Sequence, residues 1–144
     1  MPSYLPPESP ITLDLEAGGE EQAIRSVAGL LEGKAGIRDH AAFIGAVLER
    51  QKINPPLLGC GIALPHARTG AVSEIVFAAA RCREPVDFSG TAVSLVFLFG
   101  VPPDRIAEYL AMTAALARRL RDPKIVADLM GAADEASFRS ILEG

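Results

Sequence analysis

The sequence is poor in cysteine, has no excess of basic charge and contains no long hydrophobic run. Cys60 and Cys82 lack metal-ligand spacing and no secretory signal is visible, which favours reduced, partly buried thiols over a disulfide framework. The longest apolar run, residues 93–101, is about half a membrane span. The net charge of −4 provides no basic surface for nucleic acid. We therefore expect a soluble, cytoplasmic protein that neither inserts into a membrane nor binds nucleic acid.

Several catalytic signatures are absent as well. The sequence has no glycine-rich phosphate loop, no dinucleotide-binding fingerprint and no Gly-x-Ser-x-Gly elbow. Its only histidines are His40, which we expect to be exposed at a helix start, and His66. No cysteine or second histidine stands at obvious ligand spacing from His66. These observations predict neither a metal site nor a cofactor.

Length and composition predict one folded domain. The 144 residues are 49% hydrophobic and 22% charged, which is ordinary for a globular protein with a buried core. Residues 1–10 are polar and rich in proline, so we expect a flexible lead-in there. No linker, internal repeat or low-complexity tract interrupts residues 11–144, which we assign to the single domain.

The apolar periodicity predicts a mixed order of helices and strands. Residues 84–88 are expected to form a surface turn leading into a strand. Residues 92–99 are almost wholly apolar, as in a central strand covered on both faces. The order fits an α/β (α+β) sandwich with a mostly buried sheet. Strands are expected at 11–15, 61–64, 74–81 and 92–99, and helices at 20–31, 39–51, 104–121, 123–130 and 134–142.

The most informative segment is residues 59–68, Gly-Cys-Gly-Ile-Ala-Leu-Pro-His-Ala-Arg. Pro65 fixes its own φ and pushes Leu64 into the extended region, so His66 is expected at the end of a short strand with a stiff main chain. An imidazole held in this way serves as a nucleophile, a base or a ligand, or simply makes one structural hydrogen bond. The residues alone leave these alternatives open.

Residues 61–66, Gly-Ile-Ala-Leu-Pro-His, resemble the phosphorylation-site motif of the fructose/mannitol-type enzyme IIA domains of the bacterial phosphoenolpyruvate-dependent phosphotransferase system. That family includes the nitrogen-regulatory enzyme IIA proteins. The resemblance covers nearly the whole chain, because residues 11–50, 95–104 and 110–138 are also similar to the family's strands and helices. It implies a phosphotransferase/anion-transport-protein-like fold, with a mixed sheet of about five strands flanked by helices on both faces.

The resemblance further implies that His66 accepts a phosphoryl group from a phosphohistidine of an HPr-type carrier protein. The downstream partner would be a regulatory target or an enzyme IIB. A neutral imidazole with an ordinary pKa near 6.5 retains a nucleophilic nitrogen at cytoplasmic pH. Phosphoryl transfer depends mainly on positioning and charge stabilisation, which a rigid Pro65–His66 strand end can provide. The chain would be a component of a phosphotransferase rather than a stand-alone enzyme.

Three side chains are candidates to support the phosphoryl group. Arg50 matches the arginine that ends the family's second helix, although the pattern alone favours a solvated helix-end cation. Arg68 follows the acceptor by two positions, where an exposed rim residue is the simpler interpretation. Tyr109 stands where many members carry a second histidine, and it offers either a hydroxyl or ordinary packing.

The glycine and the proline of the motif are also candidates, and two prolines depart from the family pattern. Gly61 allows a tight turn or close approach of the backbone before the strand, and Pro65 stiffens the chain before the histidine. Pro55 and Pro56 replace positions where many members carry serine and threonine, so hydroxyl donors are expected to be missing there.

A regulatory phosphoryl carrier is the leading hypothesis. The replaced hydroxyl positions and Tyr109 motivate an alternative, a binding module on the same fold that is not phosphorylated. A separate sugar-transport enzyme IIA subunit is a further alternative. A hydrolase that uses His66 as a base lacks a partner nucleophile and ranks last.

Overall fold

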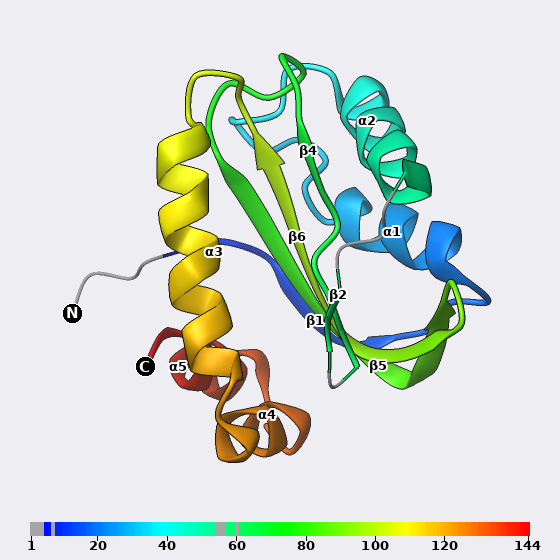
Figure 1. The fold of residues 1–144 in the computed structure, drawn as a ribbon, viewed down its shortest axis with the longest axis vertical. Coiled ribbons are helices and arrows are strands. Elements are labelled where there is room, and N and C mark those ends of the chain that lie inside the picture. Colours follow the sequence, from blue (N-terminus) through cyan, green and yellow to red (C-terminus); the bar gives the residue numbers. More distant parts are fainter. Residues whose placement is uncertain (1–4, 7, 54–56, 60) are drawn as a thin grey trace.

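The computed structural model describes residues 5–6, 8–53, 57–59 and 61–144. Its centre is one mixed sheet with the strand order β1-β5-β6-β3-β2, in which β4 also pairs with β6 (Figure 1). β3 and β4 both run parallel to β6, so they occupy successive parts of one strand position. Among the described residues, six strands therefore fill five positions: β1 (Ile11–Leu15), β2 (Leu57–Gly59), β3 (Ile62–Ala63), β4 (His66–Arg68), β5 (Val76–Phe88) and β6 (Thr91–Val101).

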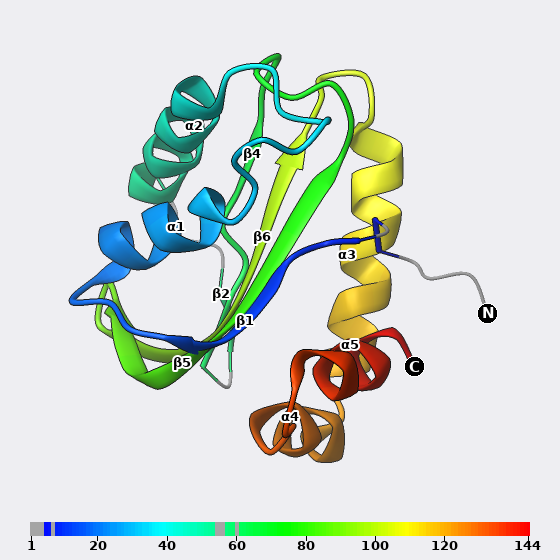
Figure 2. The same cartoon turned by 180° about the vertical axis from the view of Figure 1, so that it is seen from behind.

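Helices cover both faces of this sheet, as Figures 1 and 2 show. α1 and α2 lie on one face, and α3, α4 and α5 lie on the other. The α/β sandwich predicted from the sequence is therefore confirmed. Within the described residues, no helix combines the length and apolar character needed to cross a bilayer. The helices are α1 (Glu20–Gly29), α2 (His40–Ile53), α3 (Ile106–Leu120), α4 (Pro123–Met130) and α5 (Glu135–Glu143).

The two faces of β5 explain why the core has two layers. Successive side chains of a strand point to opposite faces, so Val76 and Ala78 pack toward α1 and α2 while Phe77 and Ala79 pack toward α3 and α5. β6 lies in the middle of the sheet, and its residues 95–99 are at most 1% exposed. This double coverage accounts for the apolar run at residues 93–101.

The predicted turn at residues 84–88 is wrong. β5 continues through Phe88, and the chain reverses at Ser89 and Gly90, both with positive φ. Val86 and Phe88 alternate inward and are buried, which a period-two pattern would have indicated. The pairing register with β6 shifts between Arg81 and Val86, and this irregularity accommodates Pro85 within a long, curved strand.

Two further features of the structure are not evident from the sequence. Within the predicted flexible lead-in, Leu5 and Ser9 are buried, and the Arg139 guanidinium donates a hydrogen bond to the Ser9 carbonyl at 2.7 Å. His40 is half-buried rather than exposed, because its Nε2–H donates to the Ala28 carbonyl at 2.9 Å near the end of α1. Both polar contacts arise from tertiary packing that local sequence does not reveal.

The structure describes Cys82 but not Cys60. Cys82 is a free, buried thiol on β5, and burial raises its pKa to about 11. It is therefore a small core residue that stays protonated at neutral pH. Cys60 lies outside the described residues. Residues 1–4 and 7 of the lead-in also lie outside them.

Candidate functional site

His66 is the first residue of β4, at an edge of the sheet, where it lies opposite Phe99 of β6. The predicted strand at 61–64 is shorter than expected, and β4 begins after a break at Leu64 and Pro65. Pro65 has no N–H to donate, but its carbonyl accepts a hydrogen bond from the Phe99 N–H at 3.0 Å. His66 is therefore anchored at a strand start by the residue before it.

The imidazole of His66 has a fixed orientation. Its Nδ1 lies 3.1 Å from the carbonyl oxygen of Leu64, and because a carbonyl only accepts, Nδ1 carries the proton. Nε2 is then left with a free lone pair. Burial lowers the pKa of His66 below its usual value, and the positive charge of Arg50 lowers it further, while the Leu64 hydrogen bond opposes this shift. At neutral pH the side chain is a neutral nucleophile.

Arg50 and Tyr109 approach His66 from two helices. Arg50, in the last turn of α2, is close enough for its charge to lower the pKa of both His66 and Tyr109. The Tyr109 ring, on α3, lies 5.4 Å from the His66 ring and meets the edge of Phe99 at the same distance. Burial outweighs the effect of Arg50 and raises the pKa of Tyr109 to about 12, so its hydroxyl stays protonated.

The other predicted site residues are more dispersed. Arg68 is exposed and lies two residues after His66, hence on the same face of β4. Gly61 is outside the cluster, because its carbonyl accepts from Ser94 while His66 lies beside Phe99, five residues further along β6. Its positive φ of 75° and the Ala92 oxygen, 3.2 Å from where a Cβ would lie, give it a structural role. Pro55 and Pro56 lie outside the described residues.

Sequence reasoning missed two features of the site. The Leu64 carbonyl that sets the imidazole tautomer is a backbone group, so no residue type signals it. Two large apolar side chains on the helices that carry Arg50 and Tyr109 are also exposed: Ile53, 80% exposed, ends α2, and Leu110, 58% exposed, follows Tyr109 on α3. Leu110 belongs to an apolar stripe that suggests a core position, and only the orientation of α3 shows that it faces solvent. In the described part of the chain, no three His, Cys, Asp or Glu side chains converge to hold a metal ion.

The site thus combines one neutral imidazole nitrogen, a nearby guanidinium and a protonated phenol at a sheet edge. This set of groups suits the acceptance of an anionic group better than hydrolysis. A sequence profile of the family described as "Phosphoenolpyruvate-dependent sugar phosphotransferase system, EIIA 2" matches residues 5–144. The chain belongs to this family of phosphoryl-carrier domains, as the resemblance of residues 61–66 predicted.

Individual relatives point to both regulatory and transport proteins. The nitrogen regulatory protein of Bradyrhizobium diazoefficiens is 31% identical, over 89% of this chain and 85% of its own length. The Escherichia coli 2-O-alpha-mannosyl-D-glycerate-specific EIIABC component is also 31% identical, but the chain spans only 21% of that protein. The crystal structure of nitrogen regulatory protein IIA-Ntr from Neisseria meningitidis matches with a TM-score of 0.84 at 32% identity, covering 92% of both chains.

Proposed function

We propose that Nε2 of His66 is the phosphoryl acceptor of this domain and that the donor is a phosphohistidine of an HPr-type carrier. The lone pair on Nε2 attacks phosphorus, the phosphorus–nitrogen bond of the donor breaks, and the donor imidazole leaves with that electron pair. Nδ1 keeps its proton throughout, bound to the Leu64 carbonyl. The product is a phosphohistidine, and the reverse reaction passes the group to the next partner.

The observation that carries this proposal is the hydrogen bond from Nδ1–H to the Leu64 carbonyl, because it leaves only Nε2 able to attack. The lowered pKa of His66 keeps that nitrogen unprotonated. The guanidinium of Arg50 supplies positive charge where three phosphoryl oxygens would sit, and Tyr109 adds a protonated hydroxyl beside the ring. Arg68 lies at the rim, where it can contact a docked donor.

A protein donor also fits the surroundings of His66. Ile53 and Leu110 leave apolar side chains in solvent on α2 and α3, which is typical of a docking surface. After transfer, the receiver is a regulatory target or an enzyme IIB in the cytoplasm. We favour the regulatory role because two of the relatives above are nitrogen regulatory proteins that this chain covers for most of their length. The E. coli mannitol enzyme IIA, 22% identical, has been solved in complex with phosphorylated enzyme IIB, which supports the transport alternative.

The test is reconstitution with phosphoenolpyruvate, enzyme I and an HPr-type carrier, followed by intact mass measurement. We expect a mass increase of one phosphoryl group that is lost in acid, as phosphoramidate bonds are. His66→Ala should abolish it. His40→Gln is the matched control, because His40 is the other histidine and binds the Ala28 carbonyl away from the site; it should be phosphorylated normally.

Three results would change the assignment. Absence of any mass increase with cognate carriers would favour the binding module that is not phosphorylated. Phosphorylation followed by transfer to an enzyme IIB would favour the sugar-transport role over the regulatory one. Phosphorylation that persists in His66→Ala would overturn the acceptor itself.

A further inference from the structure

The buried face of α2 ends in a polar residue. The buried side chains of this helix are Phe43, Val47 and Gln51, which recur every four residues and so form one stripe along it. Phe43 and Val47 are apolar core residues, whereas Gln51 carries an amide and is only 5% exposed. Burying an amide costs free energy unless its polar atoms find partners. The position of Gln51 therefore requires a hydrogen-bonding partner from another element.

The partner of Gln51 is Glu20, the first residue of α1. The Gln51 Nε2–H donates to Glu20 Oε2 at 3.1 Å, and the two residues are 31 positions apart in the sequence. Because a carboxylate only accepts hydrogen bonds, it must face the NH₂ group of the amide, and this fixes the amide orientation. Among the described residues, Gln51 Oε1 is then left buried without a hydrogen-bond partner. The bond to Glu20 is thus gained together with an unpaired oxygen, which costs stability.

The second oxygen of Glu20 is bound by the hairpin between β5 and β6. The Ser89 hydroxyl donates to Glu20 Oε1 at 2.7 Å. Ser89 has a φ of 53°, a left-handed conformation that glycine or asparagine adopts more readily than serine. Figure 1 shows the far end of β5 curling toward the start of α1, where this contact is made. The Glu20 carboxylate therefore joins α1, the end of α2 and the hairpin.

Arg50 is the neighbour of Gln51 in the last turn of α2. Its charge acts on both His66 and Tyr109, as their lowered pKa contributions show. Helix ends fray unless tertiary contacts hold them, and Gln51 is the last buried residue of α2. A long side chain delivers its charge to one place only if the backbone that carries it is fixed. The contact of Gln51 with Glu20 is therefore well placed to fix Arg50.

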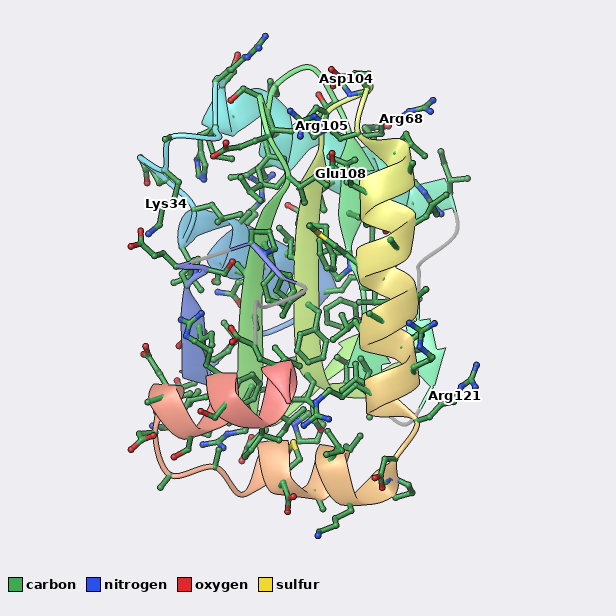
Figure 3. All side chains as sticks on the ribbon, turned by 90° about the vertical axis from the view of Figure 1, so that its left-hand side faces the viewer. Lys34, Arg68, Asp104, Arg105, Glu108 and Arg121 are labelled. Carbon is green, nitrogen blue, oxygen red and sulfur yellow. The ribbon has the colours of Figure 1, made fainter. Side chains whose placement is uncertain are left out.

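The phenol side of the site does not share this link. Tyr109 lies on α3, on the opposite face of the sheet, where its ring meets the edge of Phe99. Figure 3 shows Arg105 and Glu108 at the start of α3, and these two side chains pair at 3.2 Å. Neither contact involves α1 or α2. Loss of the Glu20 bonds would therefore loosen the guanidinium side of the site and leave the phenol side in place.

We propose that Glu20 is a positioning residue for phosphoryl transfer: it holds the end of α2 through Gln51 and thereby places the Arg50 guanidinium beside the incoming phosphoryl group. This inference rests on the proposed function of His66. An apolar side chain at position 51 would avoid the unpaired oxygen, but apolar contacts are not directional and would define the helix end less sharply. Stability and transfer rate should therefore respond differently when the link is removed.

Gln51→Met removes the link while keeping a side chain of similar length. It deletes both the bond to Glu20 and the unpaired oxygen, so the urea midpoint should be unchanged or higher. Hydrogen exchange of the amides at positions 50 and 51 should nevertheless be about fivefold faster, because the last turn of α2 opens locally. The rate of transfer from a saturating phosphorylated HPr-type carrier should fall about three- to tenfold, less than in Arg50→Gln, since the guanidinium is displaced rather than removed.

Variants of Glu20 provide the conservative comparison and the control. Glu20→Ala should lower the transfer rate as Gln51→Met does, whereas Glu20→Gln keeps one acceptor oxygen and should lose less. Glu21→Ala is the matched control, because Glu21 is the other acid in the first turn of α1 but pairs with Arg25 on the same helix. It should transfer at the rate of the unmodified protein.

A double-mutant cycle decides whether the effect passes through Arg50. Gln51→Met made in the Arg50→Gln protein should change the transfer rate by less than about twofold. An equal loss of rate in both backgrounds would assign Gln51 a merely structural role and overturn the inference, as would unchanged exchange at the end of α2. Normal phosphorylation that Gln51→Met does not slow would overturn this inference alone. Absence of phosphorylation in the unmodified protein would overturn the proposed function of His66 as well.

Discussion

His66 shows how one side chain acquires a role from its immediate contacts. Its sequence neighbours made it a candidate acceptor, but a histidine near a strand end also serves as an ordinary structural residue. The Leu64 carbonyl selects the tautomer, and burial with the nearby charge of Arg50 keeps the ring neutral. The hydrogen bond, the burial and the nearby charge together leave Nε2 unprotonated and nucleophilic at neutral pH.

The titration of His66 is the first prediction at this scale. Its midpoint, followed by NMR, should lie below the ordinary value of about 6.5. Because burial is the main cause, Arg50→Gln should raise the midpoint only slightly. As the pH falls below about 6.5, the unfolded chain takes up this proton before the folded one, so the free energy of unfolding should decrease. His66→Ala should lose this part of the pH dependence of the free energy of unfolding. A His66 titration midpoint at or above 6.5 would contradict the prediction.

Tyr109 gives a second prediction. Tyr109→Phe keeps the ring beside His66 but removes the hydroxyl, which we expect to donate to the phosphoryl group. Loss of one hydrogen bond to a charged group, about 1.5–3 kcal/mol, corresponds to a rate about 10- to 100-fold lower. A Tyr109→Phe rate equal to that of the unmodified protein would assign Tyr109 to packing alone.

At the scale of elements, the contact between α2 and β6 depends on a glycine. A Cβ on Gly100 would come within 2.6 Å of the Phe43 ring and 2.8 Å of Val76. The absence of a side chain lets α2 pack closely beside the strand that β4 joins. The same helix carries Arg50, so this packing also places the guanidinium near His66.

Gly100→Ala should therefore lower the free energy of unfolding by about 1–3 kcal/mol, since an aromatic ring cannot move aside without strain. Gly45→Ala is the matched control on α2, because a Cβ at that position would meet no atom within 4 Å. It should raise stability by about 0.5–1 kcal/mol through helix propensity. Urea unfolding of both variants measures the difference, and equal midpoints would contradict the close packing.

At the scale of the whole molecule, one arginine ties the C-terminal helices to the sheet. Arg81 of β5 donates to the carbonyls of Leu129, Met130 and Ala132 around the end of α4, and to Leu13 of β1. These bonds use carbonyls that the helix end leaves unpaired. Arg81 therefore links two strands to the layer formed by α4 and α5.

Arg81→Ala should lower the free energy of unfolding by about 1.5–3 kcal/mol, because several buried or half-buried carbonyls lose a charged donor. Arg25→Ala is the control, since Arg25 makes an exposed ion pair with Glu21 within α1. Its expected cost is about 0.3–0.5 kcal/mol. Urea titration compares the two, and hydrogen exchange should show faster opening of α4 and α5 only in Arg81→Ala. A similar loss of unfolding free energy in both variants would show that Arg81 does not hold α4 and α5 to the sheet.

Much of the fold was predictable because its signals are local. The apolar stripe of residues 106–120, Pro123 after the capping Asp122, and the apolar run of β6 each depend on residues close in the chain. β5 beyond Arg81 was missed because Pro85 is typical of a turn, whereas a register shift accommodates it in the strand.

The sequence by itself determined the helices and most of the strands, the family and His66 as the candidate acceptor, but it did not predict β2 or the second half of β5. Tertiary structure decided which residues join it: Arg50 and Tyr109 come from two helices far apart in the chain, while Gly61, a near neighbour of His66 in the sequence, lies elsewhere. It also decided the tautomer and the hydrogen bond that joins α1 to the end of α2. The reason is physical, since periodicity records which way a side chain points relative to its neighbours, whereas hydrogen-bond partners depend on how whole elements pack.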